Sequence, residues 1–361
     1  MKKNYLNFYK NKKVLVTGHT GFKGSWLTLW LISLGAKVLG ISKDVPTKPS
    51  LFKSARLKSK IKSVRGDIIN YDFLNKKINE FEPDIVFHLA AQAIVKESYL
   101  SPLNTWRSNL IGTLNILDVL KNYKGKKIVS VFITSDKVYK NLETYKGYKE
   151  DDKLGGSDPY SASKASADIA ISSYINSFLI KNQKILISTA RAGNVIGGGD
   201  WSSGRLIPDC VKSWSKRRDV LVRNFKSTRP WQHVLEVLNG YLGLAYNLSK
   251  NQKLSGEVFN FGPKLSDKKK VIDVLNEAKL NWSSAKWKKY TNKRMNFNES
   301  KLLHLNVNKV KTKLNWKNYL TFKETIKLTI KWYINFYEKN ENIFNFSLQQ
   351  IKDYQKKIVK N

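Results

Sequence analysis

The sequence of 361 residues has a single cysteine, few acidic residues and no long apolar run. With Cys210 alone, no internal disulfide can form, and a structural zinc site built on cysteines is excluded. The most apolar run, 26–34, has nine residues, whereas roughly 20 are needed to span a bilayer. The basic N-terminus lacks the apolar core and cleavage site of a signal peptide. These absences predict a cytoplasmic protein.

The scarcity of acidic residues leaves a large positive charge, with 65 Lys and Arg against 28 Asp and Glu and a net charge of +37. Such an excess can indicate a nucleic acid or an anionic membrane as partner. Here the lysines are spread along the whole chain, with mild clusters at 268–270, 286–294 and 309–317 and no RNA-recognition or zinc-finger pattern. We therefore expect no nucleic acid as the primary partner and no membrane, although the charge should attract anionic substrates.

Short β-branched runs alternate with helical stretches, which is typical of βαβ units and a parallel sheet. The expected strands are 13–17, 37–42, 62–64, 85–89, 128–134 and 185–189, and the expected helices between them include 25–34, 109–120 and 161–175. This pattern predicts an α/β protein with a Rossmann-type doubly wound parallel sheet.

After about residue 190 the chain changes character, because 193–209 is rich in Gly, Asp and Pro and the strand signals at 220–223 and 258–261 are weaker. We predict a Rossmann domain at 1–190, with a segment near 220–263 returning to it, and a smaller C-terminal substrate domain at 191–355. The end of the chain, 338–361, is interpreted as a basic tail.

Three glycines, Gly18, Gly21 and Gly24, follow the first expected strand and open the first helix. Glycine at this spacing keeps the turn tight and lets the backbone approach a pyrophosphate, whose charge then lies at a helix N-terminus. Glycines alone are common in any tight turn, but the strand before and the helix after favour a dinucleotide site. The other candidates in this turn are His19, Phe22 and Lys23.

Residues at the ends of later strands fit the same site. Asp44, about 20 positions after the glycines, is a candidate ribose ligand; Lys43 beside it would tolerate a 2′-phosphate, so NAD is favoured over NADP but not required. Asp67, followed by Ile68, could accept from an adenine amino group or simply cap a helix. Small residues after the fourth strand would let a cofactor lie close, and the candidates there are Leu89, Ala90, Ala91 and Gln92.

Tyr160 and Lys164 are four residues apart at the start of an expected helix, so both lie on one face of it. A tyrosine has an ordinary pKa near 10. A neighbouring ammonium and the positive ring of an oxidised nicotinamide would favour the phenolate and make Tyr160 a usable base. The spacing alone is common and usually structural, but here it accompanies the glycine turn and a Thr-Ser-Asp-Lys run at 134–137, after a strand.

Together these residues resemble the extended short-chain dehydrogenase/reductase family over about residues 13–263. The resemblance assigns the family's Ser–Tyr–Lys set to Ser135, Tyr160 and Lys164, and its helix asparagine to Asn109. It implies NAD as the cofactor and no metal.

Within that family the chain resembles the sugar-nucleotide 4,6-dehydratases. Relatives acting on dTDP-glucose carry Thr-Asp-Glu where this chain has Ser135, Asp136 and Lys137, and a lysine in the third place resembles the members that use CDP-glucose. The runs at 18–24, 189–201, 205–209 and 229–234 resemble them too. The resemblance implies CDP-glucose or a related nucleotide sugar as substrate, a homodimer, and a place in making deoxysugars for bacterial surface polysaccharide such as lipopolysaccharide O-antigen.

The chemistry of such a dehydration explains the pair Asp136 and Lys137. The C6 hydroxyl of glucose leaves poorly until C4 is a ketone, which acidifies the C5 hydrogen. In the mechanism that the resemblance implies, Tyr160 takes the C4 hydroxyl proton while hydride passes to NAD, and Ser135 hydrogen-bonds the C4 oxygen. A deprotonated Lys137 removes the C5 proton and a protonated Asp136 protonates the leaving hydroxyl. The alternative for the pair is two solvated charges on a loop.

A nucleotide sugar also needs donors for its pyrophosphate. Arginine suits this because its fork matches phosphate oxygens in a bidentate way. The candidates are Asn194, Arg205, Arg223 and Arg229, with Trp231 and His233 shaping the pocket nearby.

Three alternative functions stay open. A 4-epimerase of the same family would use the same turn and Tyr–Lys pair without needing Asp136 and Lys137. A dehydratase for GDP-mannose or for a UDP- or dTDP-sugar would differ only in its pocket. A non-catalytic protein that senses NAD or binds nucleic acid could share the fold.

Overall fold

A parallel sheet of seven strands forms the centre of the fold, in the order β11-β6-β5-β4-β1-β2-β3. The computed structural model describes residues 4–179, 181–222, 224–264, 268–290 and 303–360. Every neighbouring pair in the sheet is parallel, which confirms the Rossmann-type prediction. The strands are β1 (Lys13–Thr17), β2 (Lys37–Ser42), β3 (Lys62–Arg65), β4 (Ile85–His88), β5 (Ile128–Ile133), β6 (Ile185–Ala192) and β11 (Val258–Phe261).

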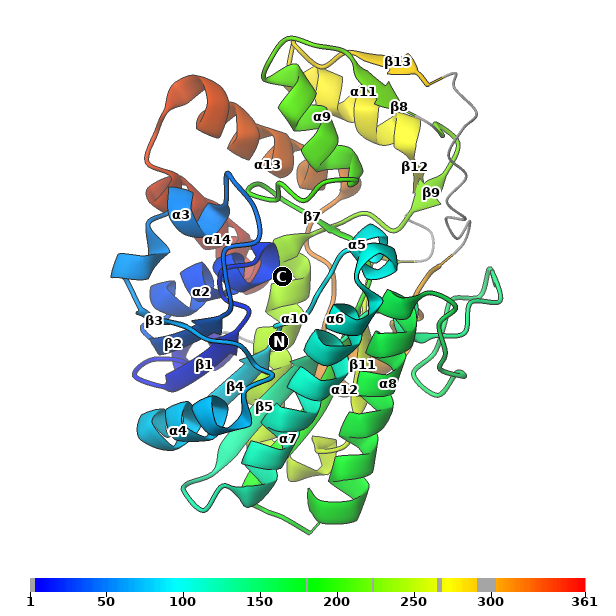
Figure 1. The fold of residues 1–361 in the computed structure, drawn as a ribbon. Coiled ribbons are helices and arrows are strands. Elements are labelled where there is room, and N and C mark those ends of the chain that lie inside the picture. The colour runs from blue at the N-terminus through cyan, green and yellow to red at the C-terminus, as the bar shows by residue number, and fades with distance from the viewer. Residues whose placement is uncertain (1–3, 180, 223, 265–267, 291–302, 361) are drawn as a thin grey trace.

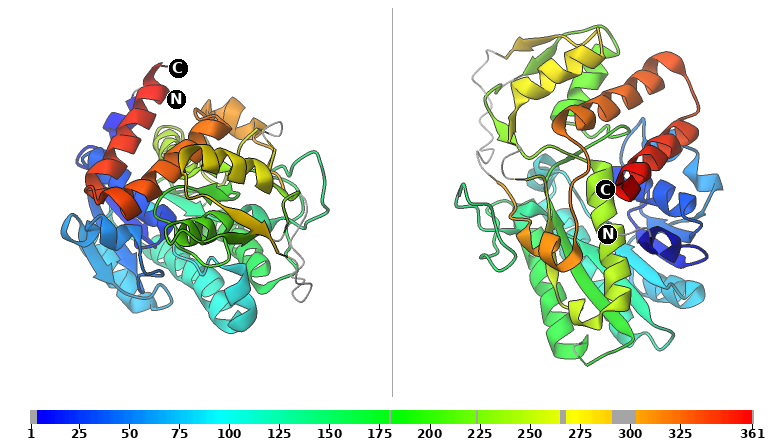
Figure 2. Two further views of the ribbon diagram at one scale, coloured as in Figure 1. Left: turned by 90° about the horizontal axis from the view of Figure 1, so that it is seen from above. Right: turned by 180° about the vertical axis from the view of Figure 1, so that it is seen from behind.

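Helices cover both faces of the sheet (Figures 1 and 2). Because side chains alternate along a strand, Val14 and Val16 of β1 enter one hydrophobic core and Leu15 enters the other. The first core also takes side chains from α2 (Phe22–Ser33), α10 (Val234–Lys250) and α14 (Ile343–Lys360), and the second takes them from α4 (Tyr71–Phe81), α7 (Gly112–Asn122) and α8 (Pro159–Tyr174). Burial on both faces explains why the strands read as continuous apolar runs.

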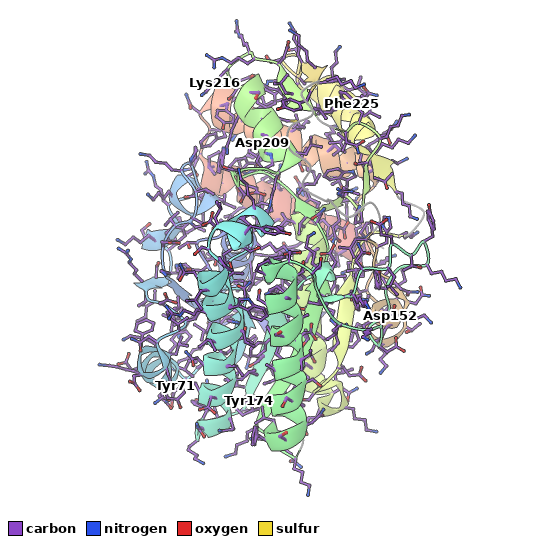
Figure 3. The ribbon with its side chains drawn as sticks, turned by 45° about the vertical axis from the view of Figure 1, so that its right-hand side comes forward. Tyr71, Asp152, Tyr174, Asp209, Lys216 and Phe225 are labelled. Carbon is purple, nitrogen blue, oxygen red and sulfur yellow. The ribbon has the colours of Figure 1, made fainter. Side chains whose placement is uncertain are left out.

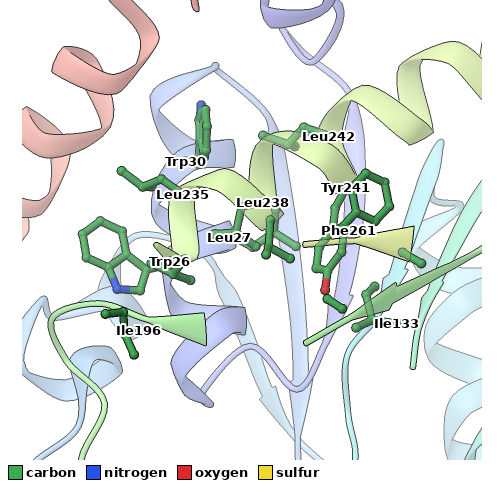
Figure 4. Packing of buried hydrophobic residues seen from close by; sticks show 14 of the residues in the cluster. Trp26, Leu27, Trp30, Ile133, Ile196, Leu235, Leu238, Tyr241, Leu242 and Phe261 are labelled. Carbon is green, nitrogen blue, oxygen red and sulfur yellow. The ribbon is translucent and has the colours of Figure 1, made fainter. Parts of the chain in front are cut away.

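The contact of α2 with α10 brings the first glycine turn next to a segment more than 200 residues later in the chain. Trp26 and Trp30 of α2 are fully buried beside Leu235 and Leu238 of α10 (Figure 4). The Trp26 indole also donates to the carbonyl of Gly198 at 2.8 Å. Its nitrogen is therefore satisfied inside the core, as burial of an indole requires.

A smaller second lobe stands beyond the carboxyl ends of the strands (Figure 1). It is made of α9 (Leu206–Trp214), α11 (Val271–Asn281), α13 (Phe322–Ile334) and the strand pairs β8 (Val220–Val222) with β13 (Trp287–Lys289) and β9 (Thr228–Arg229) with β12 (Lys269–Lys270). Between the lobes β7 (Val195–Ile196) pairs with β10 (Gln232–His233). The chain then returns to the main sheet, where β11 pairs with β6. The limits 1–190 and 191–355 for two domains stay a prediction.

The interpretation of 338–361 as a tail was wrong, because 343–360 forms helix α14 against α2. Its Ile351, Tyr354 and Ile358 are buried at helical spacing. The Tyr354 hydroxyl donates at 2.7 Å to Glu236, a carboxylate that is 1% exposed and also accepts from the backbone of 319 and 320. The apolar period of this segment was the signal available in the sequence.

Two expected helices differ in their starts. The helix expected at 25–34 already begins at Phe22, inside the glycine turn. The one expected at 109–120 begins with a π-helical turn, η2 (Arg107–Ile111), before α7. Among the described residues no helix combines the length and the apolar character that a membrane span needs. The remaining short elements are α1 (Asn4–Phe8), α3 (Leu51–Ser54), α5 (Val95–Leu100), α6 (Pro102–Trp106), α12 (Asn308–Leu314), η1 (Leu57–Ser59), η3 (Asp136–Val138), η4 (Ile175–Leu179), η5 (Gln252–Leu254) and η7 (Asn335–Lys339).

Candidate functional site

The glycine turn between β1 and α2 forms a cradle of bare backbone. Gly18 has φ +77°, and a Cβ on it would lie 2.7 Å from the backbone nitrogen of Ala90. A Cβ on Gly24 would lie 2.1 Å from the carbonyl oxygen of Gly18. Gly21 is the N-cap of α2 and offers no side chain to its first N–H groups. A pyrophosphate fits such a surface, because its oxygens could accept from these N–H groups at the positive end of the helix dipole.

His19 braces this turn rather than facing outward. Its Nδ1 lies 2.9 Å from Ser42 Oγ and its Nε2 lies 2.8 Å from Ser63 Oγ, so the ring joins the turn to β2 and β3. Burial lowers the pKa of His19 to about 4, so the imidazole is neutral near pH 7. The side chain of His19 thus supports the cradle, and its role as a cofactor ligand stays a prediction, as does that of Phe22.

The candidates for the adenosine end lie at the ends of β2 and β3. Asp44 is exposed, and its carbonyl accepts from the Thr20 hydroxyl. Asp67 is half-buried and forms an ion pair with Lys43 at 3.1 Å. Ile68 is buried in the core beneath them. Both carboxylates are therefore accessible from the edge of the sheet where the cradle lies.

The end of β4 is held in place by Asn109, in the π-helical turn. Its Oδ1 accepts from the backbone N–H of Gln92 at 2.8 Å, and its Nδ2 donates to the Gln92 carbonyl at 3.1 Å and to Ser163 Oγ at 2.9 Å. Asn109 is 1% exposed, and π-helical turns are frequent at functional sites. The asparagine thus ties the segment after β4 to helix α8; Leu89, Ala90 and Ala91, in that segment, are all half-buried.

Helix α8 brings Tyr160 and Lys164 to the end of β5. Asp158 caps the helix through the N–H of Ser161 at 3.0 Å, and both candidate side chains are buried. The Lys164 ammonium donates to the carbonyl of Ile133 at 3.1 Å. Burial lowers the pKa of Lys164 to about 8, although the nearby Asp168 carboxylate opposes this.

The protein's own groups do not lower the pKa of Tyr160, and the lowering expected beside a bound, oxidised nicotinamide stays a prediction. Burial raises the pKa of Tyr160, and the hydrogen bond with Ser135 and the charge of Arg205 offset only part of this rise. Tyr160 is a neutral phenol in this environment, because removal from water penalises the phenolate more than the neighbouring cations stabilise it.

Ser135 and Asp136 follow Thr134 just after the end of β5, beside Tyr160. Ser135 Oγ donates to Asp136 Oδ1 at 3.0 Å and accepts from the Lys137 N–H at 3.2 Å. Asp136 is 5% exposed, and its burial raises its pKa against the opposing charges of Lys137 and Lys23. Such a carboxyl can keep a proton to donate. The Lys137 side chain is half-buried.

Lys23 brings a further cation to this carboxyl from the first turn of α2. Burial and the charge of Arg205 lower the pKa of Lys23 to about 8, while Asp136 opposes the shift. The prediction made Lys23 a cofactor ligand, and the structure places its charge close enough to influence the carboxyl after β5.

The candidates for binding a nucleotide sugar lie where the chain enters the second lobe. Asn194 is exposed, whereas Arg205 pairs with Asp200 at 2.8 Å with its side chain 39% exposed. Arg229 is half-buried in β9, and the Trp231 indole donates to the Lys269 carbonyl at 3.1 Å. Arg223 lies outside the described residues.

His233 is fully buried and faces α2 rather than an open pocket. Its Nδ1 accepts from the N–H of Leu235, which caps α10, and its ring packs edge-on against Trp26. Burial lowers the pKa of His233 to about 3. Its effect on a sugar pocket stays a prediction.

One buried ion pair was missed from the sequence. Arg191 of β6 and Asp168 of α8 meet with Nη2 and Oδ1 at 2.7 Å and Nε and Oδ2 at 3.0 Å, each 3% exposed. Asp168 lies four residues after Lys164, a spacing that puts both on the same helical face. Its partner Arg191 lies on strand β6, so no pattern of neighbouring residues in the sequence predicts the pair.

Over the described residues, no group of His, Cys, Asp and Glu side chains could hold a metal ion.

The fold and these groups together define a Rossmann-type protein with a Ser–Tyr–Lys constellation at the carboxyl ends of its strands. Residues 15–329 match the model of the family described as GDP-mannose 4,6 dehydratase. The chain belongs to this family, which confirms the resemblance to sugar-nucleotide dehydratases.

Individual relatives agree with the family. The chain is 41% identical over 353 residues to a CDP-glucose 4,6-dehydratase of Salmonella typhimurium, covering 96% of this chain and 97% of that one. It is 26% identical to a dTDP-glucose 4,6-dehydratase of Haemophilus influenzae, over 89% of this chain and 97% of the relative.

Solved structures share the fold. An epimerase of Methanothermobacter thermautotrophicus matches with a TM-score of 0.78 at 22% identity, over 93% of this chain and 96% of that one. A dTDP-glucose 4,6-dehydratase of Bacillus anthracis in complex with NAD matches with a TM-score of 0.73 at 23% identity, over 93% and 99%. At this identity the likeness shows the fold alone.

The cradle gives a prediction that separates close approach from backbone strain. Gly18→Ala and Gly204→Ala both place a side chain at a positive φ, +77° and +76°, but a Cβ on Gly204 meets nothing within 4 Å. Gly204→Ala should cost about 1–2 kcal/mol of unfolding free energy. Gly18→Ala should cost about 1–3 kcal/mol more, because backbone at Ala90 must move. Urea unfolding measures both, and equal losses would contradict the close approach.

Proposed function

We propose that this chain is an NAD-dependent hydro-lyase that converts CDP-glucose to CDP-4-keto-6-deoxy-glucose. The observation that carries the proposal is the arrangement at the end of β5, where Asp136, with its pKa raised by burial, adjoins Ser135, Tyr160 and Lys137. A carboxylic acid next to an alcohol-oxidising Ser–Tyr–Lys set is what the loss of water requires. The 41% identity to a CDP-glucose 4,6-dehydratase over nearly the whole chain supports the choice of substrate.

NAD fits the cradle at Gly18 and Gly24, which a single Cβ would fill. When bound, it supplies reversible acceptance of a hydride from the sugar. The backbone of the turn would bind its pyrophosphate, Asp44 its ribose and Asp67 its adenine, since both carboxylates lie at the same sheet edge. Lys164, an ammonium beside the end of β5, would hydrogen-bond the ribose near the nicotinamide.

Tyr160 and Ser135 act on the C4 hydroxyl. Tyr160 takes the C4 proton as C4 becomes a ketone. When Asp136 carries its proton it can donate to Ser135 Oγ, which frees the Ser135 hydroxyl to donate to the C4 oxygen. Because burial raises the pKa of Tyr160 and the protein's own groups offset only part of this rise, this step would also need the positive charge of a bound, oxidised nicotinamide ring beside the phenol.

Lys137 and Asp136 carry out the elimination. Lys137 removes the proton from C5, which the ketone at C4 has made acidic, and the electron pair forms the C5–C6 double bond. The C6 hydroxyl leaves with the proton of Asp136 as one water. Lys137 returns a proton to C5. Bound NAD would supply to C6 the hydride that it had accepted from C4, so the sugar would lose only water.

The second lobe binds the rest of the substrate. Arg205 and Arg229 would contact the pyrophosphate, with Asn194 beside them, and Trp231 would line the pocket. Arg205 already lies close enough to influence Tyr160 and Lys23, so one side chain would link substrate binding to the reacting groups. On this proposal 1–190 binds NAD and 191–355 binds the sugar nucleotide.

Epimerase activity and nucleic-acid binding receive less support. A 4-epimerase would leave the buried Asp136 without a purpose. A nucleic-acid-binding protein would be expected to carry its cations in one stripe. Here long side chains, that of Lys216 among them, project around the whole outline of both lobes (Figure 3). We propose that the enzyme works in the cytoplasm, in the making of deoxysugars.

The proposed homodimer would cover an apolar surface on α5, α6 and α8. Leu100, Leu103 and Ile169 are 71%, 61% and 55% exposed on these neighbouring helices. Leu103→Glu combined with Ile169→Glu should convert a dimer to monomers, because charges are costly to bury at the core of an interface. Sedimentation velocity measures this. Leu280→Glu, on α11 with Leu280 80% exposed, is the control; a wild-type monomer would refute the dimer.

The substrate proposal is tested with a panel of CDP-, dTDP-, UDP- and GDP-hexoses and mass spectrometry. CDP-glucose should lose one water fastest, because the site supplies the acid, the base and the nucleotide-binding arginines for it. Loss of water from none of the panel would refute the dehydratase function, and a clear preference for another nucleotide would refute only the base specificity.

Two variants separate the steps. Tyr160→Phe should lower both dehydration and the reduced-nicotinamide absorbance after substrate addition, by about 10²–10⁴-fold in rate. Lys137→Ala should lower dehydration to a similar degree while the reduced nicotinamide still forms. Lys140→Ala, an exposed lysine three residues later, is the control and should behave as wild type. Normal dehydration by Lys137→Ala would show that another group is the base.

A further inference from the structure

The buried pair Arg191–Asp168 connects the helix that carries Tyr160 and Lys164 to the strand next to β5. The guanidinium meets the carboxylate side-on through two bonds, at 2.7 and 3.0 Å, and both side chains are 3% exposed. Two parallel bonds fix orientation as well as distance. The pair therefore determines how the middle of α8 lies on β6.

The same carboxylate also holds the segment that leads into the candidate site. Thr134 follows β5 and precedes Ser135, and its hydroxyl donates to Asp168 Oδ2 at 2.8 Å. Its N–H donates to the Ala190 carbonyl at 3.0 Å, next to Arg191. Asp168 thus joins the end of β5, the end of β6 and helix α8 in one cluster without solvent.

Arg191 extends this cluster to the other side of the Ser–Asp–Lys turn. Its Nη1 donates to the Tyr139 hydroxyl at 2.8 Å and to the Glu150 carbonyl at 2.9 Å. Tyr139 in turn donates to Asn260 of β11 at 2.8 Å. The turn that carries Asp136 and Lys137 is held before it, at Thr134, and after it, at Tyr139.

We propose that Asp168 and Arg191 are positioning residues for the reaction, which fix the Tyr160–Lys164 face of α8 against the Ser135–Lys137 turn. This inference rests on the proposed function and adds two residues to it. Neither residue is a catalytic residue in the proposal, since each acts through Thr134, Tyr139 or Lys164.

Charge is the second means by which Asp168 acts. Asp168 opposes the lowering of the Lys164 pKa by burial, while its carboxylate accepts from Arg191 and Thr134. The other titratable groups that interact with the Lys164 charge are Lys23 on α2 and His88 on β4, and Arg191 on β6 pairs with the same carboxylate. His88 is neutral, as burial lowers its pKa to about 3. Because Lys23 and Arg191 are cations, the Asp168 carboxylate is the group that stabilises the Lys164 ammonium.

The test is Asp168→Asn, which keeps the shape and removes the charge. Loss of a neighbouring anion lowers the pKa of an ammonium, so Lys164 should lose its proton at a lower pH. The alkaline limb of kcat for CDP-glucose dehydration should therefore move down by on the order of 1 pH unit. Competitive labelling of the Lys164 amine with acetic anhydride, followed by mass spectrometry across pH, should show the same shift without any turnover.

Three further variants serve as a fallback and as controls for this test. Asp168→Asn leaves a buried guanidinium unpaired; if it does not fold, the double variant Asp168→Asn with Arg191→Gln is measured instead, with a smaller downward shift expected because a cation is removed together with the anion. Thr134→Val keeps the charges and should lower kcat without shifting the alkaline limb of its pH profile. Tyr354→Phe removes a buried hydrogen bond to Glu236 far from the site, and should lower stability without moving the limb or the labelling curve.

The proposal is overturned if the folded Asp168→Asn or double variant has the wild-type labelling curve. Absence of dehydration by the wild-type protein is a different result, which contradicts the proposed function; the labelling curve then decides on the positioning pair by itself.

Discussion

The parallel direction of β1, β4, β5 and β6 is the constraint on which the site depends. Each strand ends at the same edge of the sheet, so the segments that follow them meet there. The glycine cradle follows β1, the Asn109-bound segment follows β4, the Ser–Asp–Lys turn follows β5, and Asn194 follows β6. An antiparallel neighbour would carry one of these segments to the opposite edge. The helical crossovers that connect parallel strands also place α2 and α8 with their N-terminal turns at this edge.

Gathering so many cations at one edge has an electrostatic cost that the protein offsets locally. Lys23 and Lys164 are both buried enough for their pKa values to fall to about 8. Each has one carboxyl near it, Asp136 and Asp168 respectively. The two carboxyls differ in environment: Asp168 is fully occupied by Arg191 and Thr134, whereas Asp136 has a hydroxyl neighbour and a raised pKa. One is suited to hold charge and the other to move a proton.

The second lobe is fixed to the sheet by aromatic side chains and one buried carboxylate. Gly198 and Asp200, in the segment that crosses between the lobes, contact Trp332 and Tyr333 of α13, with the Asp200 N–H donating to the Tyr333 hydroxyl at 3.1 Å. Glu236 at the start of α10 then accepts from Tyr354 of α14 at 2.7 Å. The C-terminal helices thus hold the segment from which Arg205 reaches the site.

The sequence by itself determined the sheet, the cradle and the Tyr–Lys face, because each depends on neighbours a few residues apart: a strand before glycines, or two side chains one helical turn apart. What only the tertiary structure decided involves partners far apart in the chain. The Arg191–Asp168 pair and the docking of α14 through Glu236 join residues 23 and 118 positions apart. The neutral state of Tyr160 also required the structure. The spacing in the sequence reveals nearby charges but not burial, and burial has the larger effect on the pKa of Tyr160.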